Sequence, residues 1–319
     1  MATWNDVRRT GILPPLPYEE WQPTKDTLHL WVQVVGKVRL ATTAPQNHWW
    51  NVPLYVDVRG LTTRRLHAGD VAFALEFDFL EHRLVLRTDQ GHVASFALED
   101  GLSVAGFDAQ LHALLADAGV DVPIREEPFG VPMKTPFPED EEHASYDADA
   151  VTRFWRVLEW VDDVFTEFAG WSCAKTSPVH LFWHSLDLAV TRFSGRRVPP
   201  PPADPVTQEA YSHELISFGF WAGDANVPAA TFYSYAAPEP AGIREQPLDP
   251  PGAHWVEQGT GSLALLGYDD VRESADPRLT LLGFLQSAYV AGTRAAGWDE
   301  AGLRSSFCPA PDALRRGLF

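Results

Sequence analysis

Apolar side chains recur at helical spacing in four separate segments, and this spacing constrains the fold more than any other feature of the chain. Over residues 146–168 the aromatic and aliphatic residues follow a 3.6-residue period after Asp147, a residue type that caps helices. The same period predicts helices over residues 24–38 and 104–118. A fourth helix is expected over residues 277–297, where a proline opens the segment and a glycine closes it.

Between the helices the apolar residues alternate with polar ones, and turn residues separate the runs. Such short, β-rich runs are typical of an antiparallel meander. They lie at residues 54–58, 71–79, 84–86, 93–98, 186–190, 215–220, 232–235 and 263–266. The chain is therefore predicted to have an α+β fold.

The two halves of the chain share this order of helix, four strands and helix. Each half is also predicted to open its first strand with a histidine and aromatic residues, at 47–50 and at 180–183. His82 follows His48 by 34 positions, and His213 follows His180 by 33. An internal duplication explains this spacing, and coincidence among the 11 histidines explains it equally well.

An acidic, proline-bearing segment at residues 136–142 is the predicted boundary between the halves. It divides the chain into an N-terminal α+β half, 1–138, and a C-terminal α+β half, 139–319. We expect the two to pack as one integrated unit.

Composition excludes several classes of function. A net charge of -18 repels phosphate backbones and anionic membrane surfaces, so neither nucleic acid nor a membrane is an expected partner. No apolar run reaches the roughly 20 residues that cross a bilayer, and residues 1–17 lack the apolar core of a signal peptide. We therefore expect a cytoplasmic protein. Cys173 and Cys308 are the only cysteines and form no C-x-x-C pair.

The segment from Lys175 to Arg197 places histidines, an aspartate and several cations in an apolar, strand-like run. Metal ligation is one interpretation, because imidazole and carboxylate groups bind zinc and non-haem iron. His180, His213 and Glu214 are the candidate ligands. Neighbours such as His213 and Glu214 point to opposite faces of a regular strand, so both bind one ion only at a bulge or a strand end.

Acid–base chemistry without a metal is the second interpretation. His180 and His213 are candidate catalytic groups, with Glu214 and Asp187 as their carboxylate partners. Arg192 and Lys175 are candidates for holding substrate charge. A structural ion pair between Asp187 and Arg192, or histidines that bond partners inside the core, accounts for the same residues.

A polar stripe on the helix predicted at 24–38 extends the candidate site. Gln33 and Lys37 follow His29 at four-residue intervals, which places all three side chains on one face. Gly36 lies beside them and is costly in a helix unless another group approaches closely. Lys37 and Arg39 are then placed to meet an anionic group. A solvated helix face is the ordinary alternative.

Several motifs of the chain resemble a bacterial family of unknown function, from about Leu16 to Trp298. They include L-H-L-W-V-Q-V-V-G-K-V-R-L from Leu28, N-H-W-W-N-V-P-L-Y-V from Asn47, S-P-V-H from Ser177, D-L-A-V-T-R-F-S-G-R from Asp187 and E-A-Y-S-H-E from Glu209. The resemblance implies one integrated unit and no particular activity. His48, His82, His143, His180 and His213 match the family pattern, whereas His184 stands where the family has a small residue.

These features together predict an enzyme that acts on a small anionic or aromatic molecule in a polar cavity. His180, His213, Glu214 and Asp187 would do the chemistry, and Lys37, Gln33, Lys175, Arg192 and His48 would bind the substrate. A divalent metal such as zinc or iron is the possible cofactor. The alternatives are a non-catalytic small-molecule-binding protein and a structural partner in a complex.

Overall fold

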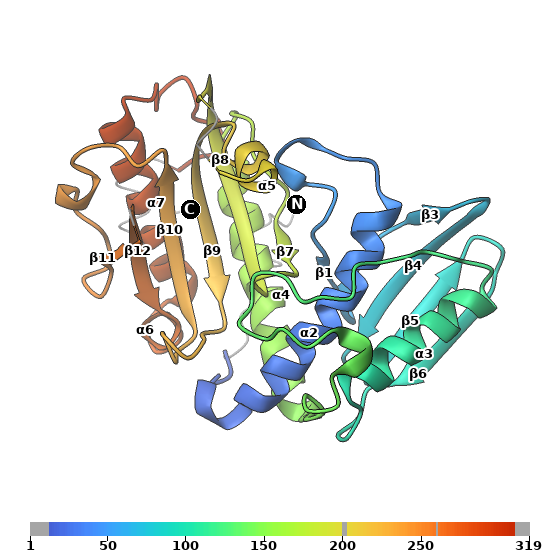
Figure 1. Cartoon of the computed structure of the whole chain (residues 1–319). Coiled ribbons are helices and arrows are strands. Elements are labelled where there is room, and N and C mark those ends of the chain that lie inside the picture. Colours follow the sequence, from blue (N-terminus) through green and yellow to red (C-terminus); the bar gives the residue numbers. More distant parts are fainter. Residues whose placement is uncertain (1–12, 200–202, 260, 310–319) are drawn as a thin grey trace, which may run out of the picture. The chain divides into compact units, whose positions relative to one another are not determined.

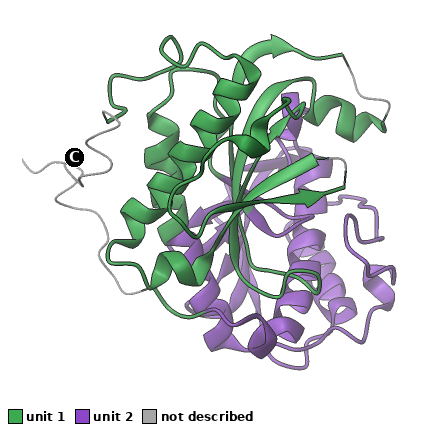
Figure 2. Ribbon diagram, turned by 90° about the vertical axis from the view of Figure 1, so that its left-hand side faces the viewer, with its two compact units in different colours: residues 1–15, 160–179, 188–319 green, residues 16–159, 180–187 purple. Residues whose placement is uncertain are grey.

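The computed structural model describes residues 13–199, 203–259 and 261–309 of the chain (Figure 1). The chain divides into two compact units, which Figure 2 shows in separate colours. Unit 2 contains residues 16–159 and 180–187, and unit 1 contains the remaining described residues. Both units combine helices with an antiparallel sheet, which confirms the predicted α+β class.

The division between the units does not coincide with the predicted boundary at residue 138. The chain changes unit within one continuous helix, between Glu159 and Trp160, and residues 180–187 return to unit 2. The strand order also differs between the two sheets, and the internal duplication is not confirmed.

Unit 2 contains a sheet of strand order β1-β2-β4-β5-β6, with β3 paired to β4. Its elements are α2 (Tyr18–Thr42), the 3-10 turn η1 (Asn47–Trp49), β1 (Tyr55–Asp57), β2 (Gly60–Thr62), β3 (Leu66–Ala68), β4 (Val71–Asp78), β5 (Arg83–Thr88), β6 (Val93–Ala97), α3 (Val104–Asp117), η2 (Phe137–Glu139), the first half of α4 (Ala148–Gly170) and β7 (His180–Phe182).

One face of the unit 2 sheet packs against helices. Phe77 on β4 and Phe96 on β6 contact Phe107 of α3, and Phe107 stacks on Trp31 of α2 with ring centroids 5.1 Å apart. Because side chains alternate along a strand, the residues at the intervening positions of β4, such as Ala74, lie on the opposite face.

Unit 1 contains a sheet of strand order β11-β12-β10-β9-β8. Its elements are the second half of α4, β8 (Asp187–Arg197, from its second residue), α5 (Pro205–Ala210), β9 (His213–Trp221), β10 (Thr231–Ala237), η3 (Ile243–Glu245), β11 (His254–Gln258), β12 (Gly261–Gly267), α6 (Tyr268–Arg272) and α7 (Pro277–Ala296).

Three of the four predicted helices lie close to their expected positions. Asp276 caps α7 by accepting a hydrogen bond from the Leu279 backbone N–H, and Gly297 ends it in the left-handed conformation. The helix predicted from residue 24 begins earlier, at Tyr18, with Pro23 inside it. No helix among the described residues is long and apolar enough to cross a membrane.

The prediction of a strand at residues 47–50 was wrong. Residues 47–49 form the 3-10 turn η1, and both His48 and Trp49 have positive φ, 54° and 59°. Left-handed backbone of this kind cannot continue a β-ladder. In the second half the histidine–aromatic segment does begin a strand, because His180 is the first residue of β7.

Gly36 on α2 shows why this helix tolerates a glycine. A Cβ atom built at this position would lie 2.2 Å from the Trp183 ring. The group that approaches the glycine closely, as the sequence predicted, is therefore the indole of Trp183. We predict that Gly36→Ala destabilises the protein by about 1–3 kcal/mol, because the buried Trp183 ring must shift to admit the methyl group. Gly170→Ala is the matched control, since nothing lies within 4 Å of a Cβ at that helical position. Urea unfolding should show a loss for the first variant only; equal stability of the two variants would contradict this packing.

Candidate functional site

The polar stripe of α2 is buried in unit 2. The Gln33 side chain donates from Nε2 to the Phe129 carbonyl (3.0 Å) and accepts from the Phe129 N–H (2.8 Å). The ammonium of Lys37 donates to the Glu127 carbonyl, and the Nε2 of His29 lies 3.1 Å from the Trp183 carbonyl. The stripe therefore binds neighbouring backbone, and the substrate-binding roles of Gln33 and Lys37 stay predictions.

Arg39 extends from the last turns of α2 to the ring of Tyr55. Its side chain is buried, with 7% of its surface exposed, and one guanidinium nitrogen donates to the Thr63 carbonyl. The guanidinium carbon lies 5.5 Å from the Tyr55 ring centroid, and that of Arg64 lies 3.4 Å from it. Burial lowers the pKa of Arg39, and the charge of Arg64 lowers it further. Tyr55 thus lies against two cations.

Neither of these arginines has a carboxylate partner among the described residues. The Nε–H of Arg39 is buried and has no hydrogen-bond partner in that part of the chain. Buried polar groups are normally paired, because leaving one unpaired costs about 1–3 kcal/mol. The guanidinium of Arg39 therefore keeps an unused donor in a cationic environment.

His180 lies beside this pair of arginines. The strand β7 is held against residue 54 by two backbone hydrogen bonds between Leu54 and Leu181, of 2.9 and 2.8 Å. This pairing brings the imidazole to the edge of the Tyr55 ring, with centroids 6.5 Å apart. Only 1% of the His180 surface is exposed, and its Nδ1 has no hydrogen-bond partner in the described structure.

The environment keeps the imidazole of His180 neutral at physiological pH. Burial lowers its pKa from 6.5 to about 3, and the charges of Arg39 and Arg64 act in the same direction. At neutral pH the ring therefore has one N–H donor and one nitrogen acceptor. A neutral histidine can donate a hydrogen bond to an anion without carrying charge itself.

A groove of about 470 Å³ opens on the far face of the unit 2 sheet from the helices. Strand register places Tyr55 opposite Thr62 and Thr62 opposite Glu76, which gives a row across three strands. The small side chains Ala72 and Ala74 line the hollow beside this row.

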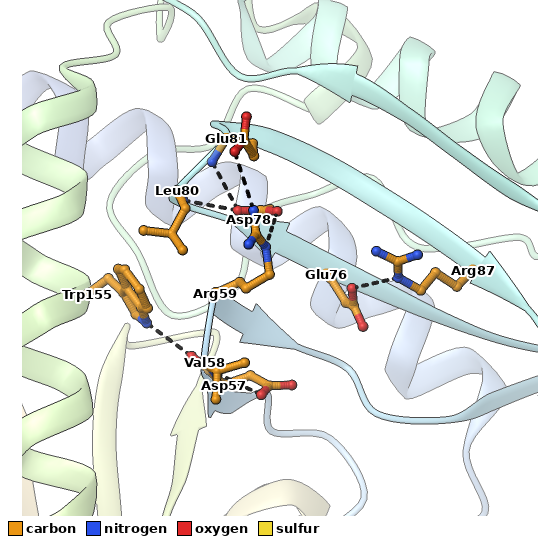
Figure 3. A network of polar contacts seen from close by, with 9 residues as sticks. All are labelled: Asp57, Val58, Arg59, Glu76, Asp78, Leu80, Glu81, Arg87 and Trp155. Atoms are coloured by element: carbon orange, nitrogen blue, oxygen red, sulfur yellow. Dashed lines mark hydrogen bonds and ion pairs between the residues drawn. The ribbon is translucent and has the colours of Figure 1, made fainter.

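The groove lining contains three arginines and three acidic residues, and two of the arginines form no ion pair with a described residue. Arg64 and Arg65 line it and are exposed, and neither forms an ion pair within the described ranges. By contrast, Arg87 is paired with Glu76 at 3.1 Å, as Figure 3 shows on the neighbouring strands. Asp57 and Asp89 provide carboxylates elsewhere in the lining. Tyr55 and Arg64 line the groove and also lie near His180, whereas His180 and Arg39 are buried beneath it and do not line it.

His213 and Glu214 belong to unit 1 and lie on β9. His213 accepts or donates one hydrogen bond with the Ser212 hydroxyl (3.0 Å). Slight burial lowers its pKa, as do Lys175 and Arg197, while Glu209 raises it. Lys175 thus lies near His213.

The carboxylate of Glu214 has its own partners. It accepts hydrogen bonds from the Ser194 hydroxyl (2.9 Å) and from Nε of Arg196 (2.7 Å). Within the described ranges no group of three or more His, Cys, Asp or Glu residues is arranged to hold a metal ion. The metal site of His180, His213 and Glu214, with zinc or iron, stays a prediction that no geometry here supports.

Arg192 is a cation buried within unit 1. Its guanidinium lies over the rings of Phe168 (3.6 Å) and Tyr289 (4.5 Å) and donates to the Phe168 carbonyl. Burial lowers its pKa to about 10. The ion pair between Asp187 and Arg192 stays a prediction; the Asp187 carboxylate accepts a hydrogen bond from the Ser185 hydroxyl. The ring of His48, also buried, lies 5.6 Å from that of Trp50.

The sequence singled out His180 and Arg39 as candidates, but not Tyr55, Arg64 and Arg65, which lie beside them. The available signal was the Thr-Thr-Arg-Arg run that follows a short strand, where two adjacent arginines have no acidic residue beside them. That run lies at the turn between β2 and β3, and Arg64 has a positive φ of 54°.

The chain belongs to a family of unknown function, DUF5996, whose model matches residues 13–305. This match confirms the family resemblance found in the sequence. Neither the search of curated proteins nor the search of solved structures found a match.

The low pKa of His180 predicts a specific loss of stability in acid. Because the unfolded chain binds a proton near pH 6.5 and the folded chain only near pH 3, stability falls as the pH drops below about 6.5. Between pH 7 and pH 5 this histidine alone should remove about 2 kcal/mol from the free energy of unfolding.

Denaturant unfolding at the two pH values measures this loss. His180→Gln should show a smaller pH-dependent loss than the native protein, by about 2 kcal/mol. His67→Gln, which removes an exposed histidine of the same unit, is the control and should keep the native dependence. An unchanged dependence in His180→Gln would show that the imidazole is not held neutral.

Proposed function

We propose that the protein binds a small organic anion in the groove of unit 2 and that His180 exchanges a proton with the bound molecule. The observation that carries this proposal is the unpartnered Nδ1 of the buried His180 beside Arg39 and Arg64, two cations without carboxylate partners in the described structure. The sequence predicted an enzyme for a small anionic or aromatic molecule. We assign that role to unit 2 and to these residues.

Electrostatics favours an anion as the ligand. A buried cation such as Arg39 is stabilised when a negative group is placed near it, because the low-dielectric surroundings strengthen the attraction. A carboxylate or phosphate also accepts several hydrogen bonds at once from guanidinium groups. Arg64 and Arg65 supply such groups at the groove, and the small residues Ala72 and Ala74 leave space for the body of the ligand.

The bound anion would also change the acid–base behaviour of His180. A negative charge near Arg39 and Arg64 offsets their field, so the pKa of the imidazole rises from about 3 toward neutral. Burial, the larger cause of the low value, remains. Proton transfer is thereby coupled to ligand binding, which is the property that a general acid or base needs.

The anion site is tested by calorimetric titration with inorganic phosphate and with benzoate. We predict that Arg64→Gln weakens binding of the better ligand by about tenfold or more, as expected for the loss of a charged hydrogen bond. Arg83→Gln is the matched control, because Arg83 is an exposed arginine on β5 of the same unit and does not line the groove. Equal binding by the two variants, or no binding of either anion to the native protein, would contradict the proposal.

The same titration separates an enzyme from a non-catalytic binding protein. Repeating it in two buffers with different ionisation enthalpies measures proton uptake on binding. If the native protein takes up a proton on binding and His180→Gln does not, the result supports proton exchange by His180. Binding without uptake favours the non-catalytic alternative.

A further inference from the structure

We propose that unit 1 contains a second ligand site, for a small primary amine that also carries a hydroxyl or carbonyl oxygen. The site is a cavity of about 320 Å³ where β9 and the end of β10 meet the C-terminal end of α7. Its polar and aromatic lining consists of Glu214, Glu239 and Trp298, and the remaining wall is mostly alanine and proline. This inference does not depend on the anion site of unit 2.

The fold of unit 1 brings these three residues together. Glu214 lies on the same face of β9 as Ile216, and Ile216 packs so closely on α7 that a Cβ on Gly292 would lie 2.6 Å from it. Glu239 lies two residues after the end of β10, and β10 pairs with β9. After α7 ends at Gly297, the Trp298 N–H bonds back to the Thr293 carbonyl at 2.9 Å, which turns the indole toward the same region.

The charge of the cavity suits a cation. The Glu239 carboxylate accepts a hydrogen bond from the Ser262 hydroxyl (3.1 Å) and forms no ion pair with the residues described here. Arg196 partly offsets Glu214, which leaves Glu239 as the uncompensated charge. The C-terminal end of α7 also carries partial negative charge, and the Ala296 carbonyl there already accepts a hydrogen bond from Arg196 (2.9 Å).

Trp298 independently points to a ligand. Its side chain is 9% exposed, and its indole N–H is buried without a hydrogen-bond partner in the described structure. An indole face attracts ammonium groups, and the indole N–H is a donor that needs an acceptor. One ligand meets both needs when it carries an ammonium group for Glu239 and an oxygen for Trp298. A free carboxylate in place of that oxygen is disfavoured by repulsion from the two glutamates.

The test uses ethanolamine as the probe on the full-length protein, in a buffer without primary amines. Binding is followed by calorimetry and by the shift of the Trp298 indole N–H resonance. We expect binding in the millimolar range or tighter, and about tenfold or greater weakening in Glu239→Gln. Trp298→Phe keeps a ring but loses the donor, so it should also weaken binding.

Matched controls make the result specific. Glu257→Gln removes an exposed carboxylate of the same unit that pairs with Arg244 outside the cavity, and it should bind ethanolamine like the native protein. Arg64→Gln in unit 2 should also leave this binding unchanged. Failure of ethanolamine to bind at millimolar concentration overturns the proposal, as does equal binding by Glu239→Gln and Glu257→Gln. Acetate binding in preference to ethanolamine overturns it as well.

Discussion

The packing of α2 is the constraint on which unit 2 depends. This helix is buried along most of its length, although His29, Gln33, Lys37 and Arg39 all lie on it. Each buried polar group needs a partner, since hydrogen bonds left unmade in a low-dielectric interior are costly. The first three side chains meet this need by binding the backbone of residues 127–129 and of Trp183. The helix therefore fixes two loops that have no regular structure of their own.

Arg39 is the member of this set that is not fully satisfied within the described structure. Its Nε–H and the Nδ1 of His180 both remain without partners there, and both lie near the Tyr55 ring. Buried polar groups without a hydrogen-bond partner are uncommon inside folded proteins, so each of them needs a physical explanation. In a chain with a net charge of -18, two neighbouring arginines that form no ion pair with any described residue are also unusual. We account for both facts by a small anion that binds to this cluster, and for the cavity of unit 1 by a ligand of opposite charge.

The sequence predicted the helices well because long periodic segments carry a clear signal. Ser103 and Asp276 cap α3 and α7 as their residue types favour, and α4 follows its apolar stripe. Short strands were missed: β2, β3 and β11 have three to five residues each, too few to establish alternation. The sequence could not show that the chain changes unit inside α4, because the helical pattern continues without interruption through Glu159.

The candidate site was only partly predictable for the same physical reason. His180 and Arg39 stood out because polar residues interrupt apolar runs at those positions. Their meeting at Tyr55 depends on the bridge between Leu54 and Leu181 and on the turn at Arg64, which are contacts between distant parts of the chain. No local pattern encodes such pairings. The contacts of Glu214 with Ser194 and Arg196 on β8 could not be read from local spacing either.

The central claim is that burial and two neighbouring arginines keep His180 neutral, and that an anion binds beside it. Titration of the imidazole resonances by nuclear magnetic resonance, with and without saturating phosphate or benzoate, tests it most directly. The account predicts a pKa of about 3 for the free protein and a clear rise when the anion binds. A value near the ordinary 6.5 in the free protein, or one that does not move with either anion, would contradict it.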